Sequence, residues 1–206
     1  MKKQIAFYFD NRACIGCKAC ELACKDKNNL PLGIKWRQVW DYGGGTWILK
    51  DGFFEPSGVF TYHVSASCMH CADPACQNAC PVDAVQKRED GIVLIDPNRC
   101  IGDRSCEEAC PYRAPKFDPE RNVMTKCTFC EDLLALGEKP ACVAICPQRC
   151  LDFGNLEELR NKYGKVDAIE PLPDSSFTHP SIVITPHRKS EKSGAGTGKV
   201  LTRIEK

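Results

Sequence analysis

The sequence predicts an α+β fold in which short helices and small, irregular strands form two pseudo-symmetric modules with long loop insertions. Three observations lead to this prediction. Fifteen of the 16 cysteines fall into four groups along the chain. A shift of 86 residues superposes the first group on the third, and a β-hairpin is predicted between the second and the third. Self-similarity of this kind indicates a duplicated structural unit.

Length and composition limit what the chain can be. Its 206 residues fit one large domain or two small ones. The 28 Lys and Arg nearly balance 27 Asp and Glu, so the chain lacks the basic excess of a nucleic-acid-binding protein. No apolar run approaches the roughly 18 residues of a membrane span. The apolar stretch at residues 5–9 is shorter than the core of a signal peptide. We therefore expect neither a membrane span nor a signal peptide. We also expect reduced thiols, because thiols in the cytosol are kept reduced.

The four cysteine groups share closely spaced thiols, and in three of them a proline follows the last cysteine. They are group I (Cys14, Cys17, Cys20 and Cys24), group II (Cys68, Cys71, Cys76 and Cys80), group III (Cys100, Cys106 and Cys110) and group IV (Cys127, Cys130, Cys142 and Cys146).

The spacing within group I, C-x2-C-x2-C-x3-C, is typical of iron–sulfur proteins of the bacterial ferredoxin type. Three close thiolates bind one cluster, and the fourth ligates the other cluster of a pair. Zinc is the main alternative, but zinc sites use two cysteine pairs separated by a loop rather than three or four thiols within eleven residues. A Rieske centre would need a second histidine box after His70, and none follows. Disulfides are the third alternative. The pattern favours iron–sulfur clusters.

The repeat also reveals one departure from the pattern. When group I is laid on group III, Cys14 falls on Cys100 and Cys24 on Cys110, but Cys17 falls on Asp103. Asp103 therefore occupies a position where a cysteine ligand is expected.

Residues 84–95 are predicted to form the hairpin between groups II and III, because Asp90-Gly91 is a type I′ turn signal beside a β-branched run. We expect residues 68–111 to form one two-cluster module from groups II and III. Residues 1–24 with 112–154 would form the other from groups I and IV.

The remaining segments are expected to elaborate these modules. Residues 25–67 contain all three tryptophans and are predicted to form short strands over a cluster, with a partner surface as the alternative. Helices are predicted at 132–139 and at 155–163, with Asn155 as N-cap. Residues 155–206 form a C-terminal extension, whose stretch from 187 carries six Lys and Arg against two Glu and is predicted to be a flexible tail.

Several further segments resemble the iron–sulfur subunits of bacterial molybdenum oxidoreductases, and within them the branch that serves dimethyl sulfoxide reductases. The resemblance extends to about residue 185 and is carried by residues 17–26, 86–91, 124–127, 151–154, 172–173 and 177–184.

This resemblance implies an electron-transfer subunit with no catalytic residue of its own. It would carry electrons through four clusters, from an integral-membrane quinol-oxidising anchor to a molybdopterin subunit that reduces dimethyl sulfoxide or a related S- or N-oxide. Tetrathionate, polysulfide, thiosulfate or nitrite as acceptor, and a soluble polyferredoxin-like carrier, stay open. We expect a peripheral subunit that is made in the cytoplasm and attached to the membrane through its anchor, with co-export to the periplasmic face as an alternative.

The resemblance also implies how the ligands are shared among the clusters. The implied sets are Cys14, Cys17 and Cys20 with Cys146; Cys24 with Cys127, Cys130 and Cys142; Cys68, Cys71 and Cys76 with Cys110; and Cys80 with Cys100 and Cys106.

The last set lacks a fourth thiolate, because this chain has Asp103 where the family branch has cysteine. Two outcomes stay open: a [4Fe–4S] cluster ligated by the Asp103 carboxylate, or a [3Fe–4S] cluster. The other three clusters are expected to be [4Fe–4S]. We expect Cys150 to be a small buried residue, and His63, His70, His179 and His187 to serve packing or solvation rather than ligation.

Overall fold

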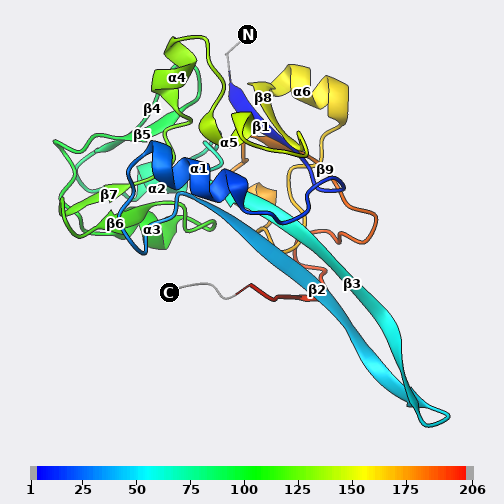
Figure 1. Ribbon diagram of the computed structural model, residues 1–206. Coiled ribbons are helices and arrows are strands. Elements are labelled where there is room, and N and C mark those ends of the chain that lie inside the picture. Colours follow the sequence, from blue (N-terminus) through cyan, green and yellow to red (C-terminus); the bar gives the residue numbers. More distant parts are fainter. Residues whose placement is uncertain (1–3, 203–206) are drawn as a thin grey trace.

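The computed structural model describes residues 4–202, which form an α+β structure of small sheets and short helices, as predicted (Figure 1). The helices are α1 (Ala19–Lys27), α2 (Ala75–Asn78), α3 (Ser105–Ala109), α4 (Glu131–Ala135), α5 (Ala141–Ala144), α6 (Leu156–Tyr163) and the 3-10 turn η1 (Ser175–Phe177). The strands are β1 (Ile5–Asp10), β2 (Arg37–Lys50), β3 (Phe53–Ser67), β4 (Val85–Lys87), β5 (Val93–Ile95), β6 (Lys116–Asp118), β7 (Val123–Thr125), β8 (Leu151–Asn155), β9 (Ile182–Thr185) and β10 (Lys199–Val200).

A three-stranded sheet of order β8-β1-β9 joins three distant parts of the chain. The central strand β1 is buried on both faces, which explains why its sequence is a continuous apolar run rather than an alternating one. Phe7 and Phe9 face the main core, whereas Ala6 and Tyr8 face Leu159 and the rest of α6. Because β8 follows group IV and β1 precedes group I, their antiparallel pairing brings these two groups together.

Strands β4 and β5 form the predicted hairpin between groups II and III. The expected type I′ turn is wrong, because Gly91 has a positive φ of 86° and Asp90 does not. Gly91 N donates to Arg88 O (3.0 Å), and the Asp90 carboxylate accepts from Ile92 N (3.1 Å). The longer connection leaves only Gly91 in the left-handed region.

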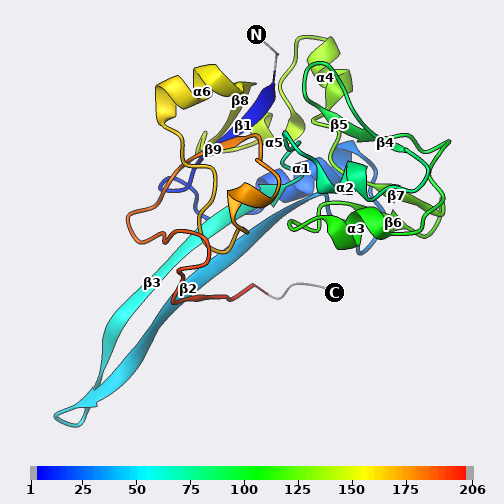
Figure 2. The ribbon, with the colours of Figure 1, turned by 180° about the vertical axis from the view of Figure 1, so that it is seen from behind.

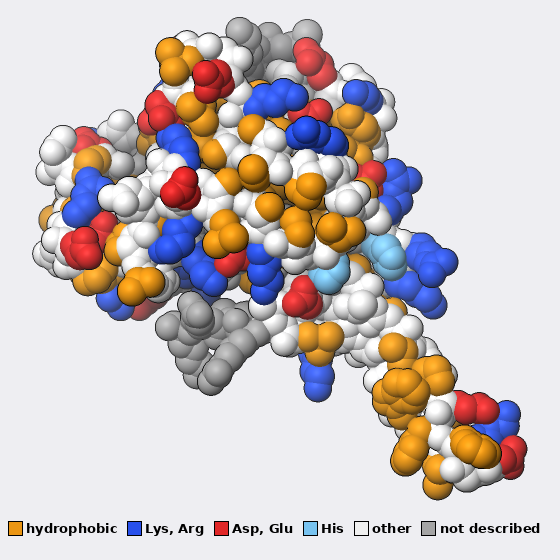
Figure 3. All heavy atoms as spheres, in the orientation of Figure 1, with side chains coloured by type: hydrophobic (Ala, Val, Ile, Leu, Met, Phe, Trp, Pro, Cys, Tyr) orange, Lys and Arg blue, Asp and Glu red, His pale blue; other side chains and the backbone are white. Residues whose placement is uncertain are grey.

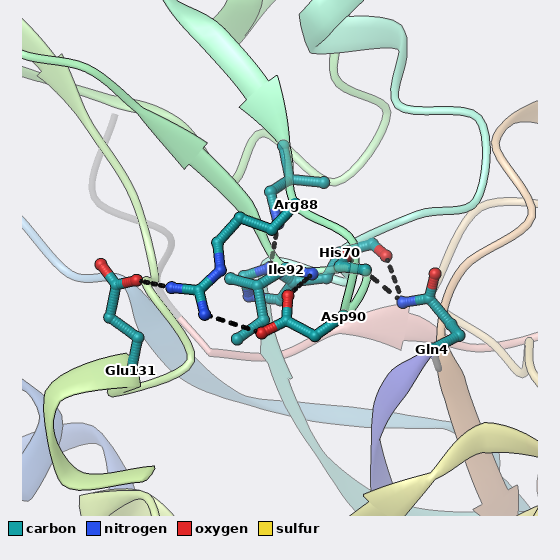
Figure 4. Close-up of polar contacts among 8 residues, drawn as sticks. Gln4, His70, Arg88, Asp90, Ile92 and Glu131 are labelled. Carbon is teal, nitrogen blue, oxygen red and sulfur yellow. Dashed lines mark hydrogen bonds and ion pairs between the residues drawn. The ribbon is translucent and has the colours of Figure 1, made fainter. Parts of the chain in front are cut away.

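Polar contacts fasten this hairpin to the rest of the molecule (Figure 4). Gln4 Nε2 donates to the backbone oxygens of His70 and Gly91, each at 3.3 Å. Arg88 forms an ion pair with Glu131 at the start of α4. Group II, the hairpin and group IV are therefore held against the N-terminal segment.

The segment 25–67 differs from its prediction. Instead of short strands over a cluster, β2 and β3 form one long antiparallel ribbon that projects from the body (Figures 1 and 2). Trp36 and Trp40 pack against the core at its base, whereas Trp47 is 62% exposed on the projecting part. Aromatic and β-branched residues in both strands favour extended pairing, and the register shifts at a bulge where Gly45 has a φ of 97°.

The C-terminal stretch also differs from its prediction of a flexible tail. Strand β10 pairs with β2, and Gly198 N donates to Tyr42 Oη (3.0 Å). Gly194 N donates to Glu170 Oε1 (2.6 Å). Backbone pairing with β2 thus holds this stretch against the base of the ribbon, and Figure 2 shows it lying there. Residues 203–206 of the predicted tail lie outside the described residues.

Both predicted helices in the second half of the chain are present. Helix α4 is shorter than expected, because Gly137 adopts a φ of 76° and ends the helical path. Helix α6 matches its prediction, and its N-cap Asn155 accepts from Glu157 N (3.0 Å) and Glu158 N (3.4 Å).

Replacing Asn155 by Ala should destabilise the protein, because two backbone N–H groups at the start of α6 lose their acceptor. The expected cost is about 1 kcal/mol, which corresponds to a Tm lower by roughly 2–4 °C. Anaerobic thermal denaturation at a fixed scan rate measures it. Asn155→Asp keeps the acceptor oxygen and should retain the wild-type Tm; equal values for Asn155→Ala and wild type would contradict this role for the cap.

Candidate iron–sulfur cluster sites

Two internal cavities are lined by cysteines that come from different groups. Each has a cavity volume of about 20 Å³. Cysteines lining the first are Cys14, Cys17, Cys20, Cys146 and Cys150. Cysteines lining the second are Cys68, Cys71, Cys76 and Cys110. The fold therefore brings the first three thiols of group I to Cys146 of group IV, and the first three of group II to Cys110 of group III.

The same turn precedes the second ligand position in all four groups. The residue before it has a positive φ in each case: Gly16 (68°), His70 (43°), Gly102 (71°) and Phe129 (60°). A left-handed residue in such a turn directs successive backbone N–H groups towards one point, which creates a concavity suited to negative charge. Such a conformation is uncommon for bulky residues like Phe129, so these turns are features of the site. The spacing of the cysteines alone does not reveal His70 and Phe129 in this role.

The remaining cysteines form two further sets. Burial raises the pKa of Cys24 to about 12, and the nearby thiols of Cys142 and Cys130 add to this shift. Cys127 is buried, and its pKa is raised by burial and then by the nearby Cys24. The structure thus brings Cys24 of α1 together with the thiols of group IV.

Group III forms the last set around α3. Burial raises the pKa of Cys106 to about 12, with further contributions from the charges of Cys100, Asp103 and Cys80. Asp103 is exposed, as is Cys17 at the equivalent position of group I. Its Oδ2 accepts a hydrogen bond from Ser105 Oγ (2.7 Å). The carboxylate therefore lies near the Cys106 thiol and has a hydrogen-bond partner at the start of α3.

Backbone donors and unpaired polar atoms fit these sites to a negatively charged group. Ala84 N donates to Cys80 Sγ (3.2 Å) and Met124 N to Cys100 Sγ (3.2 Å), as N–H groups do towards cluster thiolates. In the second cavity, Tyr112 Oη and Thr178 Oγ1 are buried without a hydrogen-bond partner among the described residues. Among residues 4–202, no three His, Cys, Asp or Glu side chains are close enough to hold a single metal ion. A cubane cluster separates its thiolates further, because iron and sulfide atoms lie between them.

Cys150 is buried as predicted, at 4% exposure. Its place is not predicted by the sequence pattern: Cys150 Sγ lies 3.4 Å from Cys146 Sγ and lines the first cavity. A hydrogen bond from Cys150 lowers the pKa of the Cys14 thiol. The cavity of the first set thus contains a fifth thiol.

The histidines have structural partners. His63 Nδ1 lies 2.7 Å from Asp41 Oδ1, and His179 Nδ1 lies 2.9 Å from Asp73 Oδ2. His187 Nδ1 accepts from the backbone N of the residue two positions on (3.2 Å).

His70 is the buried one of the four. Its Nδ1 accepts from Val93 N (3.0 Å), and burial lowers its pKa well below the usual value, so the ring is neutral.

Two buried cations lie beside the cysteine sets, and the sequence pattern does not single out either as part of a site. Arg37, at the start of β2, is 3% exposed. Lys126 is also 3% exposed, lines the second cavity and donates to the backbone oxygens of Val93 and Cys127. Lys126 could have been noticed because it lies within the segment 124–127 that resembles the family.

Within residues 4–202, every helix is too short or too polar to cross a lipid bilayer.

Comparison with known proteins agrees with the cysteine pattern. The model of a 4Fe-4S dicluster domain matches residues 59–156. The sequence is 48% identical to the B subunit of anaerobic dimethyl sulfoxide reductase from Escherichia coli (strain K12), over 96% of each protein. It is 38% identical to the B subunit of polysulfide reductase from Wolinella succinogenes, over 92% of this protein and 97% of that one. It is also 38% identical to a thiosulfate reductase electron transfer subunit of Salmonella typhi, over 77% and 79% respectively. The resemblance predicted from the sequence is thereby confirmed, and this protein belongs to the family of the iron–sulfur B subunits of anaerobic dimethyl sulfoxide reductases.

Proposed function

We propose that this chain transfers electrons through four iron–sulfur clusters to a molybdopterin subunit that reduces dimethyl sulfoxide or a related S- or N-oxide. The electrons would come from a quinol-oxidising anchor subunit in the membrane, to which this chain attaches as a peripheral subunit. The observation that carries this proposal is the pair of cavities, each lined by cysteines from two distant groups.

We propose four ligand sets, which the pocket linings and the burial of the thiols support. They are Cys14, Cys17, Cys20 and Cys146 for the first cluster; Cys24, Cys127, Cys130 and Cys142 for the second; Cys68, Cys71, Cys76 and Cys110 for the third; and Cys80, Cys100 and Cys106 for the fourth. We propose three [4Fe–4S] clusters and a fourth that is either [3Fe–4S] or [4Fe–4S] with Asp103 as a ligand.

Two pseudo-symmetric, two-cluster modules would hold these clusters. One comprises residues 1–24 with 112–154, and the other residues 68–111. The recurrence of a left-handed residue at Gly16 and Gly102 supports this division, because both precede equivalent ligand positions of the 86-residue repeat.

The clusters supply one-electron redox chemistry, and the residues of this chain set the conditions for it. Burial of thiols such as Cys76 and Cys127 excludes water from the ligands. Backbone donors such as Met124 N stabilise negative charge on sulfur, which favours the reduced form and raises the reduction potential. Neither effect requires a proton to be transferred.

The ribbon supports a role as a fixed subunit rather than a free carrier. Its register pairs Trp47 with Pro56 and Leu49 with Phe54, which places these four side chains on one face. The two aromatic side chains are 62% and 70% exposed, and Figure 3 shows hydrophobic side chains gathered at this end of the molecule. An exposed apolar face of this kind indicates contact with another protein. We propose that a partner subunit covers it.

A second candidate function differs only in the terminal acceptor. The 38% identity to subunits of polysulfide and thiosulfate reductases supports the same electron-transfer role with a sulfur-compound reductase as partner. The 48% identity to the dimethyl sulfoxide reductase subunit favours the first candidate.

Anaerobically purified protein should contain about 15–16 iron atoms per chain, the sum over four clusters with or without one iron missing. It should also contain acid-labile sulfide. Cys146→Ser should lower this number, because it removes a ligand of the first cluster. Cys150→Ser, which changes a neighbouring thiol in the same cavity, should leave it unchanged. About eight iron atoms per chain, or stoichiometric zinc, would rule out the ligand assignment.

Replacing Asp103 by Cys should complete the fourth ligand set with a thiolate. If the native cluster is [3Fe–4S], the variant should gain one iron per chain and lose the EPR signal of an oxidised three-iron cluster. Its potential should fall, because a thiolate donates more charge to iron than an empty site does, and quinol-dependent turnover should slow. An artificial donor acting directly on the molybdopterin subunit should keep its rate.

Asp103→Asn separates the two forms of the native cluster. It removes the carboxylate charge without adding a thiol, so it should cost an iron only where the carboxylate is a ligand. Unchanged iron, EPR signal and quinol-dependent turnover in both variants would mean that Asp103 lies beside a cluster that does not depend on it.

Replacing Trp47, Leu49 and Phe54 together by Ser should weaken co-purification of the partner subunits, because it removes most of the apolar side chains on this face of the ribbon. The matched control replaces Lys50 and Glu55 by Ser; these two side chains form an ion pair (3.7 Å) on the other face. Iron content should stay at the wild-type value in both variants. Equal recovery of the partners with both would mean that this face is not an interface.

A further inference from the structure

We propose that Arg37 is a positioning residue that raises the reduction potentials of the two clusters of groups I and IV, because its guanidinium lies buried between their ligand sets. This inference rests on the proposed function, since it concerns the clusters assigned there. Arg37 is not itself a ligand.

Among residues 4–202, no carboxylate forms an ion pair with the Arg37 guanidinium. Nη1 donates to Ser65 Oγ (3.0 Å) and to Ser65 O (3.4 Å), and the guanidinium carbon lies 4.8 Å from the centre of the Phe7 ring. Nη2 is buried and has no hydrogen-bond partner among the described residues. The carboxylate of the nearby buried Glu21 binds Lys35 Nζ (2.8 Å) and Val39 N (3.1 Å) instead.

Four cysteine sulfurs lie near this cation, and as cluster ligands they would carry the negative charge that it faces. Burial acts to lower the pKa of Arg37, but the interaction with nearby cysteines in their thiolate form outweighs burial and raises the pKa. Those cysteines are Cys142, Cys20, Cys127 and Cys24. Three of them belong to the proposed second cluster, and Cys20 belongs to the first. Arg37 therefore lies between two ligand sets that the proposed function fills with clusters.

A hydrogen-bonded path also connects Arg37 to the first set. Arg37 has donors only, so the Ser65 hydroxyl oxygen accepts from it. Ser65 Oγ lies 3.4 Å from Cys20 Sγ, and its hydroxyl hydrogen is left to donate to that sulfur. Arg37 can thus act on the first cluster through the hydrogen bonds of Ser65 and through its charge. It can act on the second cluster through its charge.

The direction of the effect follows from electrostatics. A cluster gains negative charge when it is reduced, and a fixed positive charge nearby stabilises that form. The interaction is strong in this buried site, because the low dielectric screens it little. A guanidinium stays protonated throughout the working pH range, so the effect does not depend on a titrating group. Both potentials should therefore lie higher with Arg37 than without it.

Redox titrations of the assembled complex, followed by EPR, test this inference. Arg37→Gln should lower the potentials of the first and second clusters, whereas Ser65→Ala should lower only that of the first. The cluster of Cys68, Cys71, Cys76 and Cys110 is an internal reference that should not shift in either variant. Arg121→Gln, which removes an exposed cation between β6 and β7, is the matched control and should shift none.

Unchanged potentials in an Arg37→Gln variant with wild-type iron content would overturn the inference. If that variant loses iron, Arg37→Lys and Arg37→Met separate charge from packing. Recovery of iron and of both potentials by Lys but not by Met supports the inference. Equal recovery by Met, or loss of iron in every variant, means that Arg37 serves packing or folding and overturns it. A wild-type iron content of about eight atoms or fewer would instead defeat the proposed function itself.

Discussion

The convergence of buried thiols from distant segments is the constraint on which the rest of this structure depends. Cys146 lies in the same cavity as Cys14, although more than one hundred residues separate them. Thiolates in a protein interior require compensating positive charge. In the proposed function the iron of the clusters supplies most of it, so binding of the clusters and folding of the chain are coupled. Short helices and two-stranded sheets are enough around these sites, because the clusters would hold the surrounding segments together.

Two features organise the backbone around the sites: one sheet and the left-handed turns. The sheet β8-β1-β9 brings the two ends of the sequence pattern together, with the buried Phe7 and Phe9 of β1 fixing its position in the core. The left-handed turns then aim backbone N–H groups inward at each group. Where the turn residue is His70 or Phe129, the side chain is also used for packing: the two rings lie 5.2 Å apart, and Phe129 stacks on Phe7 at 4.0 Å. Strain in the turns is thus offset by burial of the same residues.

The base and the far end of the ribbon differ in their surroundings. Its base contributes Arg37 and Ser65 to the interior, where a cation faces the thiols. Its far end presents Trp47 and Phe54 to the outside. The same pair of strands therefore extends from the proposed partner surface to the cysteines of the first and second sets.

The sequence by itself determined the class of fold, the four cysteine groups, the hairpin between groups II and III and the cap at Asn155. It also revealed that Asp103 stands where the repeat predicts a cysteine. These features are local or periodic, so spacing and side-chain type are enough to reveal them. Only the tertiary structure decided which residues meet across long separations: Cys150 beside Cys146, Arg37 among the thiols, and β10 on β2. It also decided that residues 37–67 form one extended ribbon. Strand propensity does not predict over how many residues two strands pair. No local signal distinguishes a buried arginine from an exposed one, because burial depends on the packing of the whole molecule.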